Sequence, residues 1–308
     1  MRLGHREPVP ESLRGAVLAL GNFDGFHLGH QAVVGEAVQW ARTEGRPAIV
    51  ATFDPHPQRF FTPDAPPFRL TTLDQREALF EDVGAAAMMV FHFDAALAGT
   101  TADDFVCELL GKRFGAAGVV TGEDFTFGKG RAGNVGVLRD RGGTCGIAAR
   151  TVGPVLDDGR PISSSRIREA LQAGDCGEAA RLMTRPFAIR GTVEHGDKVG
   201  RTLGYPTANL PLGNYLRPRY GVYAVTAQLP DGRVLKGAAN LGVRPQFEPP
   251  KELLEPYFFD FSGDLYGQEI EVAFHCFLRP EAKFDSLDAL KTQMDADCAE
   301  AQRVLAGT

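Results

Sequence analysis

The stretch from Val17 to Thr43 constrains the fold of this chain more than any other. It opens with an apolar run, Val17–Leu20, that has the length and composition of a short buried strand. The glycine-rich segment Gly21–His30 follows, and residues 31–43 then repeat apolar side chains at helical spacing. This order predicts a strand, a tight turn and a helix that begins near His30.

The start of that helix has the properties of a phosphate-binding site. Backbone N–H groups without helical partners and the positive end of the helix dipole attract anions there. Gly21, Gly25 and Gly29 allow the backbone to approach a ligand closely. His27 and His30, three residues apart, can direct two imidazole donors at the same anion. An ordinary turn with two capping histidines has the same spacing, so the residues alone leave both interpretations open.

Strand and helix patterns continue to alternate up to about residue 185. Apolar runs predict strands at 48–53, 86–93, 117–121 and 146–152, and periodicity with caps predicts helices at 72–83, 101–114, 164–173 and 177–183. Such alternation indicates an α/β doubly wound, Rossmann-like domain with a parallel sheet. Gly21–His30, Asp54–Pro57 and Gly122–Gly130 each follow a strand, and we expect them to converge on one edge of the sheet.

The pattern changes after Arg185. Alternating and β-branched segments predict strands at 188–193, 222–229, 234–240, 257–261 and 269–278, with Pro230-Asp231-Gly232 as a hairpin turn. A long helix with apolar residues between Leu287 and Leu305 closes the chain. We therefore expect two domains, 1–185 and 186–308, the second an antiparallel β-barrel with a C-terminal helix.

Charge and cysteine usage exclude several classes of protein. A net charge of −6 and a pI near 5.7 argue against broad binding of nucleic acid or an anionic membrane. No run reaches membrane-spanning length, and residues 1–14 lack the apolar core of a signal peptide, so we expect a cytoplasmic protein. The five cysteines are scattered without C-x-x-C spacing, which indicates neither a disulfide framework nor a zinc site. The oligomeric state is not determined by the sequence.

Two further segments of the first domain carry candidate phosphate ligands. Gly122–Gly130, with Asp124, is a glycine-rich loop that either presents backbone donors to a nucleotide or is a plain turn. Ser164 and Ser165 stand at a predicted helix start, and Arg168 is one turn further on, where it can pair with phosphate oxygens. An ordinary serine cap with surface arginines is the alternative interpretation.

The second domain has its own glycine-rich segment, from Gly196 to Asn209. It is not a Walker A loop, because no G-K-[ST] ends it. Its glycines and cations can nevertheless wrap the phosphates of a nucleotide; they include Gly196, Lys198, Gly200 and Arg201. Thr207 and Asn209, two apart on an extended chain, share one face and offer oxygen ligands suited to Mg²⁺. A glycine-rich hairpin that ends at Pro206 is the simpler interpretation.

Four motifs of the first half resemble those of bacterial bifunctional riboflavin kinase/FMN adenylyltransferases, also called FAD synthetases. In order they are Gly21–His30, Phe53–Pro57, Gly122–Gly128 and Ile162–Arg168, with Ser165 where that family usually has threonine. The resemblance implies a domain that joins FMN and ATP to form FAD and pyrophosphate. It implies that His27 and His30 are catalytic, and that the nucleotide contacts come from Gly21, Phe23, Asp24, His27, His30, Asp124, Ser164, Ser165 and Arg168.

The second half resembles the riboflavin kinases of the same family. The resemblance lies in Gly200–Asn209, Asn240–Pro245 and Asp264–Gly267. It implies phosphorylation of riboflavin by ATP with Mg²⁺, a catalytic base at Glu255, nucleotide contacts from the Gly196–Asn209 segment, and flavin contacts from Arg279 and Glu281. Tyr257 stands where the family commonly has histidine, and Gln246 stands where threonine is usual.

Two alternative functions remain open at this point. In one, the first domain transfers a nucleotide to another small phosphate compound while the kinase is retained, although the Phe53–Pro57 and Gly122–Gly128 motifs disfavour this. Alternatively, the chain is a non-catalytic, flavin-binding regulator, against which the intact His27, His30 and Glu255 count. In every case the expected ligands are small molecules, namely ATP, riboflavin and FMN.

Overall fold

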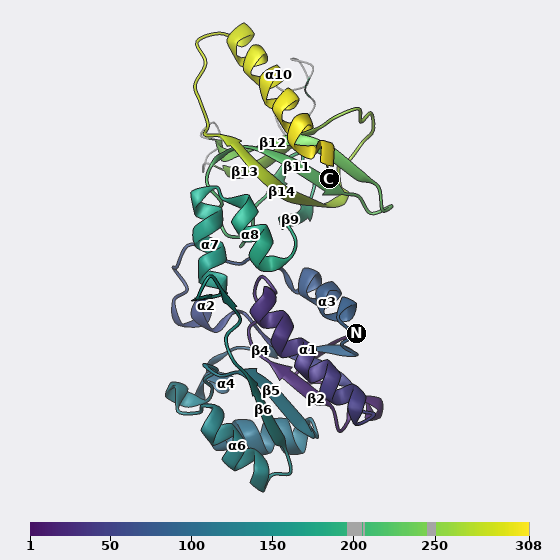
Figure 1. Ribbon diagram of the computed structural model, residues 1–308, viewed down its shortest axis with the longest axis vertical. Helices are drawn as coiled ribbons and strands as arrows, with labels where there is room; N and C mark the ends of the chain where they lie inside the picture. The colour runs from purple at the N-terminus through teal and green to yellow at the C-terminus, as the bar shows by residue number, and fades with distance from the viewer. Residues whose placement is uncertain (196–204, 206, 245–250, 308) are drawn as a thin grey trace. The chain divides into compact units, whose positions relative to one another are not determined.

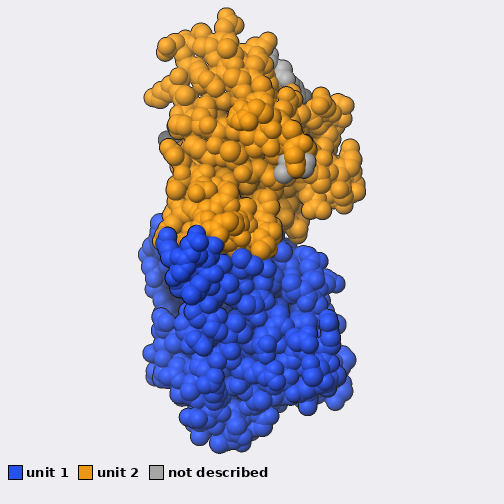
Figure 2. Space-filling view, in the orientation of Figure 1, with its two compact units in different colours: residues 1–66, 72–163 blue, residues 67–71, 164–308 orange. Residues whose placement is uncertain are grey.

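The computed structural model describes residues 1–195, 205, 207–244 and 251–307 (Figure 1). The chain forms two compact units, coloured separately in Figure 2. The first contains Met1–Pro66 and Thr72–Ser163, and the second contains Pro67–Thr71 and the residues from Ser164 onward. Residues 164–183 therefore pack with the second unit, whereas the predicted functional boundary near residue 185 stays a prediction.

A six-stranded sheet forms the centre of the first unit. Its strands are β1 (Arg2–Gly4), β2 (Val17–Leu20), β3 (Ala48–Asp54), β4 (Ala87–His92), β5 (Gly118–Gly122) and β6 (Ala148–Val152). They lie in the order β1-β4-β3-β2-β5-β6, and every pair is parallel. The predicted doubly wound parallel sheet is thus confirmed, with β1 as an edge strand that the sequence patterns did not predict.

Helices cover both faces of this sheet. They are α1 (Leu28–Thr43), α2 (Pro57–Phe61), α3 (Leu73–Asp82), α4 (Ala95–Gly99), α5 (Ala102–Asp104), the π-type helix η2 (Phe105–Arg113) and α6 (Val135–Thr144). Short 3₁₀ turns (η1, Glu11–Leu13; η3, Lys129–Arg131) and a small hairpin (β7, Leu156–Asp157; β8, Arg160–Pro161) complete the unit.

Alternation along β2 shows how the two faces are filled. Val17 and Ala19 pack with the buried side of α1, whereas Leu18 and Leu20 pack on the opposite face with residues of η2 and α6. All four side chains are almost completely buried, which is typical of a central strand in a parallel sheet with helices on both sides.

The topology brings the predicted loops to one edge of the sheet. β3, β2 and β5 are neighbours and run in the same direction, so their carboxyl ends lie side by side. Gly21–His30 follows β2, Asp54–Pro57 follows β3, and Gly122–Gly130 follows β5. The edge at which α/β sheets bind ligands is therefore built from the segments that the sequence singled out.

The cysteine prediction was wrong for one pair. Cys107 on η2 and Cys145, directly after α6, form a disulfide with their Cα atoms 5.5 Å apart. Cys176, Cys276 and Cys298 are free, as expected. The two paired cysteines are 38 residues apart in sequence and meet only because α6 packs against η2, a contact that cysteine spacing does not reveal.

Reduction of this disulfide is expected to destabilise the first unit. Opening the 38-residue loop should cost about 2–4 kcal/mol, because the unfolded chain regains the entropy that the crosslink removes. Trp40, the single tryptophan, is buried in this unit and reports its unfolding in denaturant with and without reductant. A Cys107→Ala/Cys145→Ala variant should be insensitive to reductant. Five free thiols in the unreduced, denatured protein, instead of three, would contradict the disulfide.

The second unit contains a six-stranded sheet of antiparallel pairs. Its strands are β9 (Phe187–Thr192), β10 (Leu210–Pro211), β11 (Gly221–Gln228), β12 (Val234–Arg244), β13 (Lys251–Phe258) and β14 (Glu269–Arg279), in the order β10-β13-β12-β11-β14-β9. Its two edges approach each other where Glu194 pairs with Asn209, so the sheet curves into a near-barrel. This confirms the predicted architecture.

One strand lies elsewhere than predicted. Residues 257–261 were expected to be extended, but β13 spans Lys251–Phe258, and Asp260 has φ of 51° in the turn that follows. The charged residues Lys251, Glu252 and Glu255 interrupt the apolar pattern of the strand, so periodicity alone placed it too late. The shift puts Glu255 in the middle of a strand.

The helices of this unit are α7 (Ser164–Ala173), α8 (Cys176–Met183) and α10 (Leu287–Val304), followed by the short turn η4 (Leu305–Gly307). α10 covers the outer face of the sheet, where Ala301 and Leu305 pack on Ala224 and Ala238. The small alanine side chains allow a close approach of helix and strands. The predicted C-terminal helix over the barrel is confirmed.

Candidate active sites

The loop after β2 is held in a strained shape by buried side chains. Phe23 and Phe26 have positive φ, 50° and 40°, and Gly25 between them has φ of 85°. Both rings are 2% exposed and contact Phe80 edge to face, at 5.8 and 5.1 Å between centroids. The predicted ligand Phe23 therefore acts through its ring as an anchor of the loop, and such strain is typical of functional sites.

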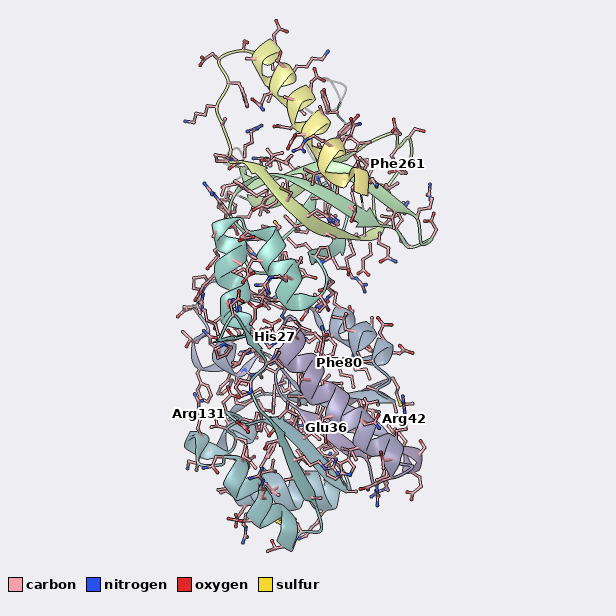
Figure 3. All side chains as sticks on the ribbon, viewed as in Figure 1. His27, Glu36, Arg42, Phe80, Arg131 and Phe261 are labelled. Atoms are coloured by element: carbon pink, nitrogen blue, oxygen red, sulfur yellow. A yellow bond between two sulfur atoms is a disulfide. The ribbon has the colours of Figure 1, made fainter. Side chains whose placement is uncertain are left out.

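His27 and His30 meet at the N-terminus of α1, where Figure 3 labels His27. The two rings are stacked, with centroids 3.6 Å apart and planes 20° from parallel. His27 caps the helix because its Nδ1 accepts a hydrogen bond from the backbone N–H of His30 at 3.3 Å. In the neutral ring, this leaves the proton on Nε2, so His27 is both a cap and a donor. The phosphate-binding and helix-capping interpretations of these histidines are thus compatible.

Gly29 allows this arrangement to form. A Cβ atom there would lie 3.1 Å from Cε1 of His27 and 3.5 Å from the carbonyl oxygen of Ile162. Ile162, the first residue of the serine–arginine motif, therefore lies beside the start of α1. Ser164, Ser165 and the residues after them belong to α7 and to the second unit. In that unit Arg168 donates from Nε to the carbonyl of Phe68 at 2.8 Å.

The loop after β5 is anchored at its far end. Gly128 has φ of 73°, and a Cβ there would lie 2.8 Å from the backbone nitrogen of Ala102. Phe127 is buried, with its ring 5.3 Å from that of Phe105. Asp124 at the near end stays exposed beside the carboxyl end of β5. The acidic end of the loop therefore lies at the sheet edge, and its glycine end is held in place by packing.

Sequence reasoning missed the side chains that support the loop after β2. Arg76 on α3 is 3% exposed and donates to the carbonyl of Asn22 at 3.0 Å and to Thr52 Oγ1 at 2.9 Å. Thr52 in turn donates to the same carbonyl at 2.8 Å. The only signal in the sequence was an arginine on the apolar stripe of an amphipathic helix pattern, and it did not identify the partner. These contacts fix the position of the Asn22 backbone.

Some buried polar atoms near this edge have no hydrogen-bond partner among the described residues. They include Oδ1 of Asn22, after β2, and Oγ1 of Thr121, near the end of the neighbouring strand β5. Buried polar atoms are nearly always satisfied in folded proteins. Their position therefore indicates that a ligand or water completes the edge.

An aromatic surface lies at the carboxyl ends of β3 and β4, and it was also missed. The rings of Phe60, Phe61 and Phe93 contact one another edge to face, at 5.1 to 5.8 Å between centroids. Phe61 is 67% exposed, so part of this cluster faces solvent. A flat aromatic ring can pack against this surface.

In the second unit, Thr207 and Asn209 lie along β13. Thr207 pairs with Tyr257, and the backbone N–H of Ala208 donates to the carbonyl of Pro256 at 3.0 Å. The segment is extended, so Thr207 and Asn209 share one face as expected. The other predicted ligands of this segment, Gly196, Lys198, Gly200 and Arg201, lie outside the described residues, as does Gln246.

Glu255 is part of a charged network. Arg244 donates from Nε to Glu255 Oε2 at 2.6 Å, and its Nη2 bonds the same oxygen. The same guanidinium donates from Nη1 to Glu281 Oε1 at 3.3 Å. Burial alone would lower the pKa of Arg244, but its bonds to the two carboxylates raise it, so Arg244 stays a cation. Glu255 is a partly buried, paired acid and not an exposed surface residue.

One predicted flavin ligand, Arg279, lies beside α10, whereas Glu281 contacts β12. Arg279 forms a two-bond ion pair with Asp297 on that helix, at 2.8 Å from Nε and 2.7 Å from Nη2. Tyr257 contacts Tyr205 edge to face at 5.0 Å, and the hydroxyl of Tyr205 bonds Asp295. That hydrogen bond raises the pKa of Tyr205. Arg279 therefore fastens the helix to the sheet, and its contact with a flavin stays a prediction.

A cavity of about 350 Å³ opens next to Thr207. Its lining combines apolar and aromatic side chains with polar ones, as in many sites for small molecules. His195 and Tyr266 stack at one wall, with ring centroids 3.8 Å apart. The lining residues include Val193, Thr207, Phe258, Phe261 (labelled in Figure 3), Asp264 and Leu265.

Two protein families match the chain, one in each half. A family described as FAD synthetase matches residues 9–166. A family described as riboflavin kinase matches residues 183–305. Each match covers the motifs predicted for its half.

Curated relatives match over nearly the whole length. The bifunctional riboflavin kinase/FMN adenylyltransferase of Pseudomonas fluorescens is 40% identical over 294 residues, which cover 95% of this chain and 94% of that protein. The protein of the same name from Escherichia coli (strain K12) is 38% identical over 283 residues, 92% of this chain and 90% of that protein. The one from Bacillus subtilis (strain 168) is 38% identical over 302 residues, with 96% and 94% covered.

A solved structure shares the fold. It comes from Streptococcus pneumoniae, is described as a macrolide-efflux protein, and matches with a TM-score of 0.87 and 32% identity over 98% of both chains. The efflux description applies to that protein. In the described part of the present chain, no helix is long and apolar enough to cross a membrane.

Proposed function

The chain belongs to the bifunctional riboflavin kinase/FMN adenylyltransferase family, and on this premise we propose how its own residues carry out the two reactions. It phosphorylates riboflavin to FMN and adenylylates FMN to FAD. The observation that carries this conclusion is the match of one family to each half of the chain. The assignment of residues below is a proposal supported by their geometry.

Adenylyl transfer takes place at the carboxyl edge of the parallel sheet. The FMN phosphate is already an anionic nucleophile, so it attacks the α-phosphorus of ATP without a strong base, and pyrophosphate leaves. Catalysis then consists of positioning and of stabilising negative charge. The stacked His27 and His30 at the start of α1 donate to the ATP phosphates, where the helix dipole favours anions.

Other residues complete this site in the proposal. Gly21 and Asp24 shape the loop after β2, and Phe23 anchors it. Asp124 is assigned to this site from the loop after β5, and Ser164, Ser165 and Arg168 are assigned to the departing pyrophosphate on the strength of their motif. The aromatic surface of Phe60, Phe61 and Phe93 offers the flavin ring an apolar face. This surface counts against a non-aromatic phosphate compound as the second substrate.

Riboflavin phosphorylation takes place in the second unit. The cavity beside Thr207 has the volume and the aromatic lining to take the base of ATP. Gly196, Lys198, Gly200 and Arg201 are assigned to its phosphates on the strength of their motif. Glu255 accepts the proton of the ribityl hydroxyl as that oxygen attacks the γ-phosphorus, and ADP leaves. The alcohol needs this base because it is a poor nucleophile when protonated.

Thr207 and Asn209 fit a Mg²⁺ ion. Both offer oxygen atoms from one face of an extended segment, and Asn209 is 7% exposed. No group of three or more His, Cys, Asp or Glu side chains in the described ranges can hold a metal ion. The cation would therefore be shared with the nucleotide phosphates, whose charge it neutralises.

A single incubation tests the function as a whole. Purified protein is mixed with riboflavin, ATP and Mg²⁺, and the flavins are then separated. We expect FMN to appear first and FAD to follow. FMN that is never converted to FAD would favour a nucleotidyltransferase for another phosphate compound. The absence of both products would favour a flavin-binding regulator.

A further inference from the structure

One face of β12 is built to hold a carboxylate. Asn240, Gly242 and Arg244 alternate along the strand and so share that face. Glu281 Oε1 lies 3.2 Å from Asn240 Nδ2 and 3.3 Å from Arg244 Nη1. It crosses the strand above Gly242, where a Cβ atom would overlap the carboxylate. A glycine at this position is therefore required for Glu281 to reach Arg244.

Arg244 joins this carboxylate to a second one. Glu255 lies on the neighbouring strand β13, directly opposite Asn240. Two nitrogens of Arg244 bond its Oε2, while a third bonds Glu281. The side chains of Arg244 and Glu255 are 18% and 20% exposed, so their attraction is weakly screened by solvent. One cation thus compensates two acids that would otherwise repel each other.

The contact with Glu255 uses only one of its two oxygens. All hydrogen bonds to its carboxylate within the described ranges go to Oε2. Two donors of a planar guanidinium on one oxygen restrict the rotation of the carboxylate. Oε1 remains to accept a proton. A base that is oriented in advance in this way does not have to be ordered at the moment of reaction.

We propose that Arg244 is a positioning residue of the kinase reaction, which holds Glu255 through Oε2 and is itself held by Glu281 above Gly242. This inference rests on the proposed role of Glu255 as the base. It also assigns Glu281 a role that does not require contact with the flavin: Glu281 acts on Glu255 through Arg244.

The test uses the full-length protein and the variants Arg244→Met, Arg244→Lys and Glu281→Gln. For Arg244→Met we expect kcat of riboflavin phosphorylation to fall about 10–100-fold, with KM for ATP unchanged within about twofold, because orientation and not nucleotide binding is lost. Arg244→Lys should retain part of kcat, since lysine keeps the positive charge but lacks the planar guanidinium that donates two hydrogen bonds to one carboxylate. Glu281→Gln should lower kcat by a smaller factor. FAD formation from supplied FMN should stay unchanged in all three variants.

A matched control is an ion pair that involves another carboxylate of β13. Arg217 pairs with Glu252 at 2.8 Å, with 20% and 33% exposure, but Glu252 faces the opposite side of β13 from Glu255. Arg217→Met removes a similar ion pair and should leave kcat of the kinase unchanged. An equal loss of kcat in both variants would mean that Arg244 acts through stability alone, and the inference would fail.

A double-mutant cycle separates this inference from the proposed function. In a Glu255→Gln background, Arg244→Met should cause little further loss of kcat, because both changes act on the same group. If Glu255→Gln alone keeps full kinase activity, the proposed base is wrong. If Glu255→Gln is inactive while Arg244→Met keeps wild-type kcat, the base stands and the role of Arg244 is refuted.

Discussion

Replacement of His30 by alanine is expected to lower the rate of FAD formation from FMN and ATP at least about a hundredfold, while FMN formation from riboflavin stays at the wild-type rate. Removing one donor to a developing anion in a preorganised site commonly costs this much. His30 is stacked on His27 at the N-terminus of α1, where it is placed to stabilise charge on the ATP phosphates. The two activities are measured separately, with FMN or riboflavin as the flavin supplied.

The fold of the variant has to be verified, because His30 also contacts Phe23 edge to face at 5.3 Å. Fluorescence of Trp40, a buried residue of α1 itself, reports whether the helix remains packed. Gln39→Ala, an exposed position further along α1, serves as the control and should keep both activities. If a folded His30→Ala protein lost both activities, the assignment of one reaction to each half would be wrong.

Glu255→Gln is expected to have the opposite effect. Riboflavin phosphorylation should fall about 10²–10⁴-fold, the range for removal of a general base, whereas FAD formation from supplied FMN should be unaffected. Glutamine keeps the size of the side chain and can still bond Arg244, so packing between β12 and β13 should be retained. The measurement is the rate of FMN production at saturating riboflavin and ATP.

Glu252→Gln is the appropriate control for this change. Glu252 lies three residues away on the same strand and forms its own ion pair with Arg217. The Glu252→Gln substitution should leave the rate of riboflavin phosphorylation close to that of the wild type. A Glu255→Gln protein with full kinase activity would remove Glu255 from the mechanism and would require another acceptor for the ribityl proton.

Much of the fold follows from local patterns. The bounds of β2 and α7 agree with those predicted, and the capping box of Thr72 and Gln75 forms as expected at the start of α3. Periodicity and caps are properties of neighbouring residues, so they are visible in the sequence. By contrast, the prediction missed α6, because Gly136, Gly142 and Gly143 lower its helix propensity. Gly142 is needed there because a Cβ would lie 2.8 Å from the carbonyl of Ile147.

The candidate sites show the same difference between features set by neighbouring residues and features set by distant ones. Motif spacing within one loop predicts His27 and His30 as phosphate ligands, and the resemblance to riboflavin kinases predicts Glu255 as the base; these roles stay predictions. The sequence did not identify Arg76, which supports the loop after β2 from another helix. Nor did it reveal that Arg244 connects Glu255 to Glu281. These partners are separated by tens of residues, and nothing in their local surroundings specifies the pairing.

The amino-acid sequence by itself determined that this protein has an α/β half and a β half, each with a glycine-rich loop, and it predicted which loops follow which strands. Only the tertiary structure decided that β3, β2 and β5 are neighbours, that Cys107 meets Cys145, and that one arginine holds two carboxylates. The physical reason is that strand order, crosslinks and buried ion pairs depend on packing between distant segments, whereas elements and motifs depend on residues close together in the chain.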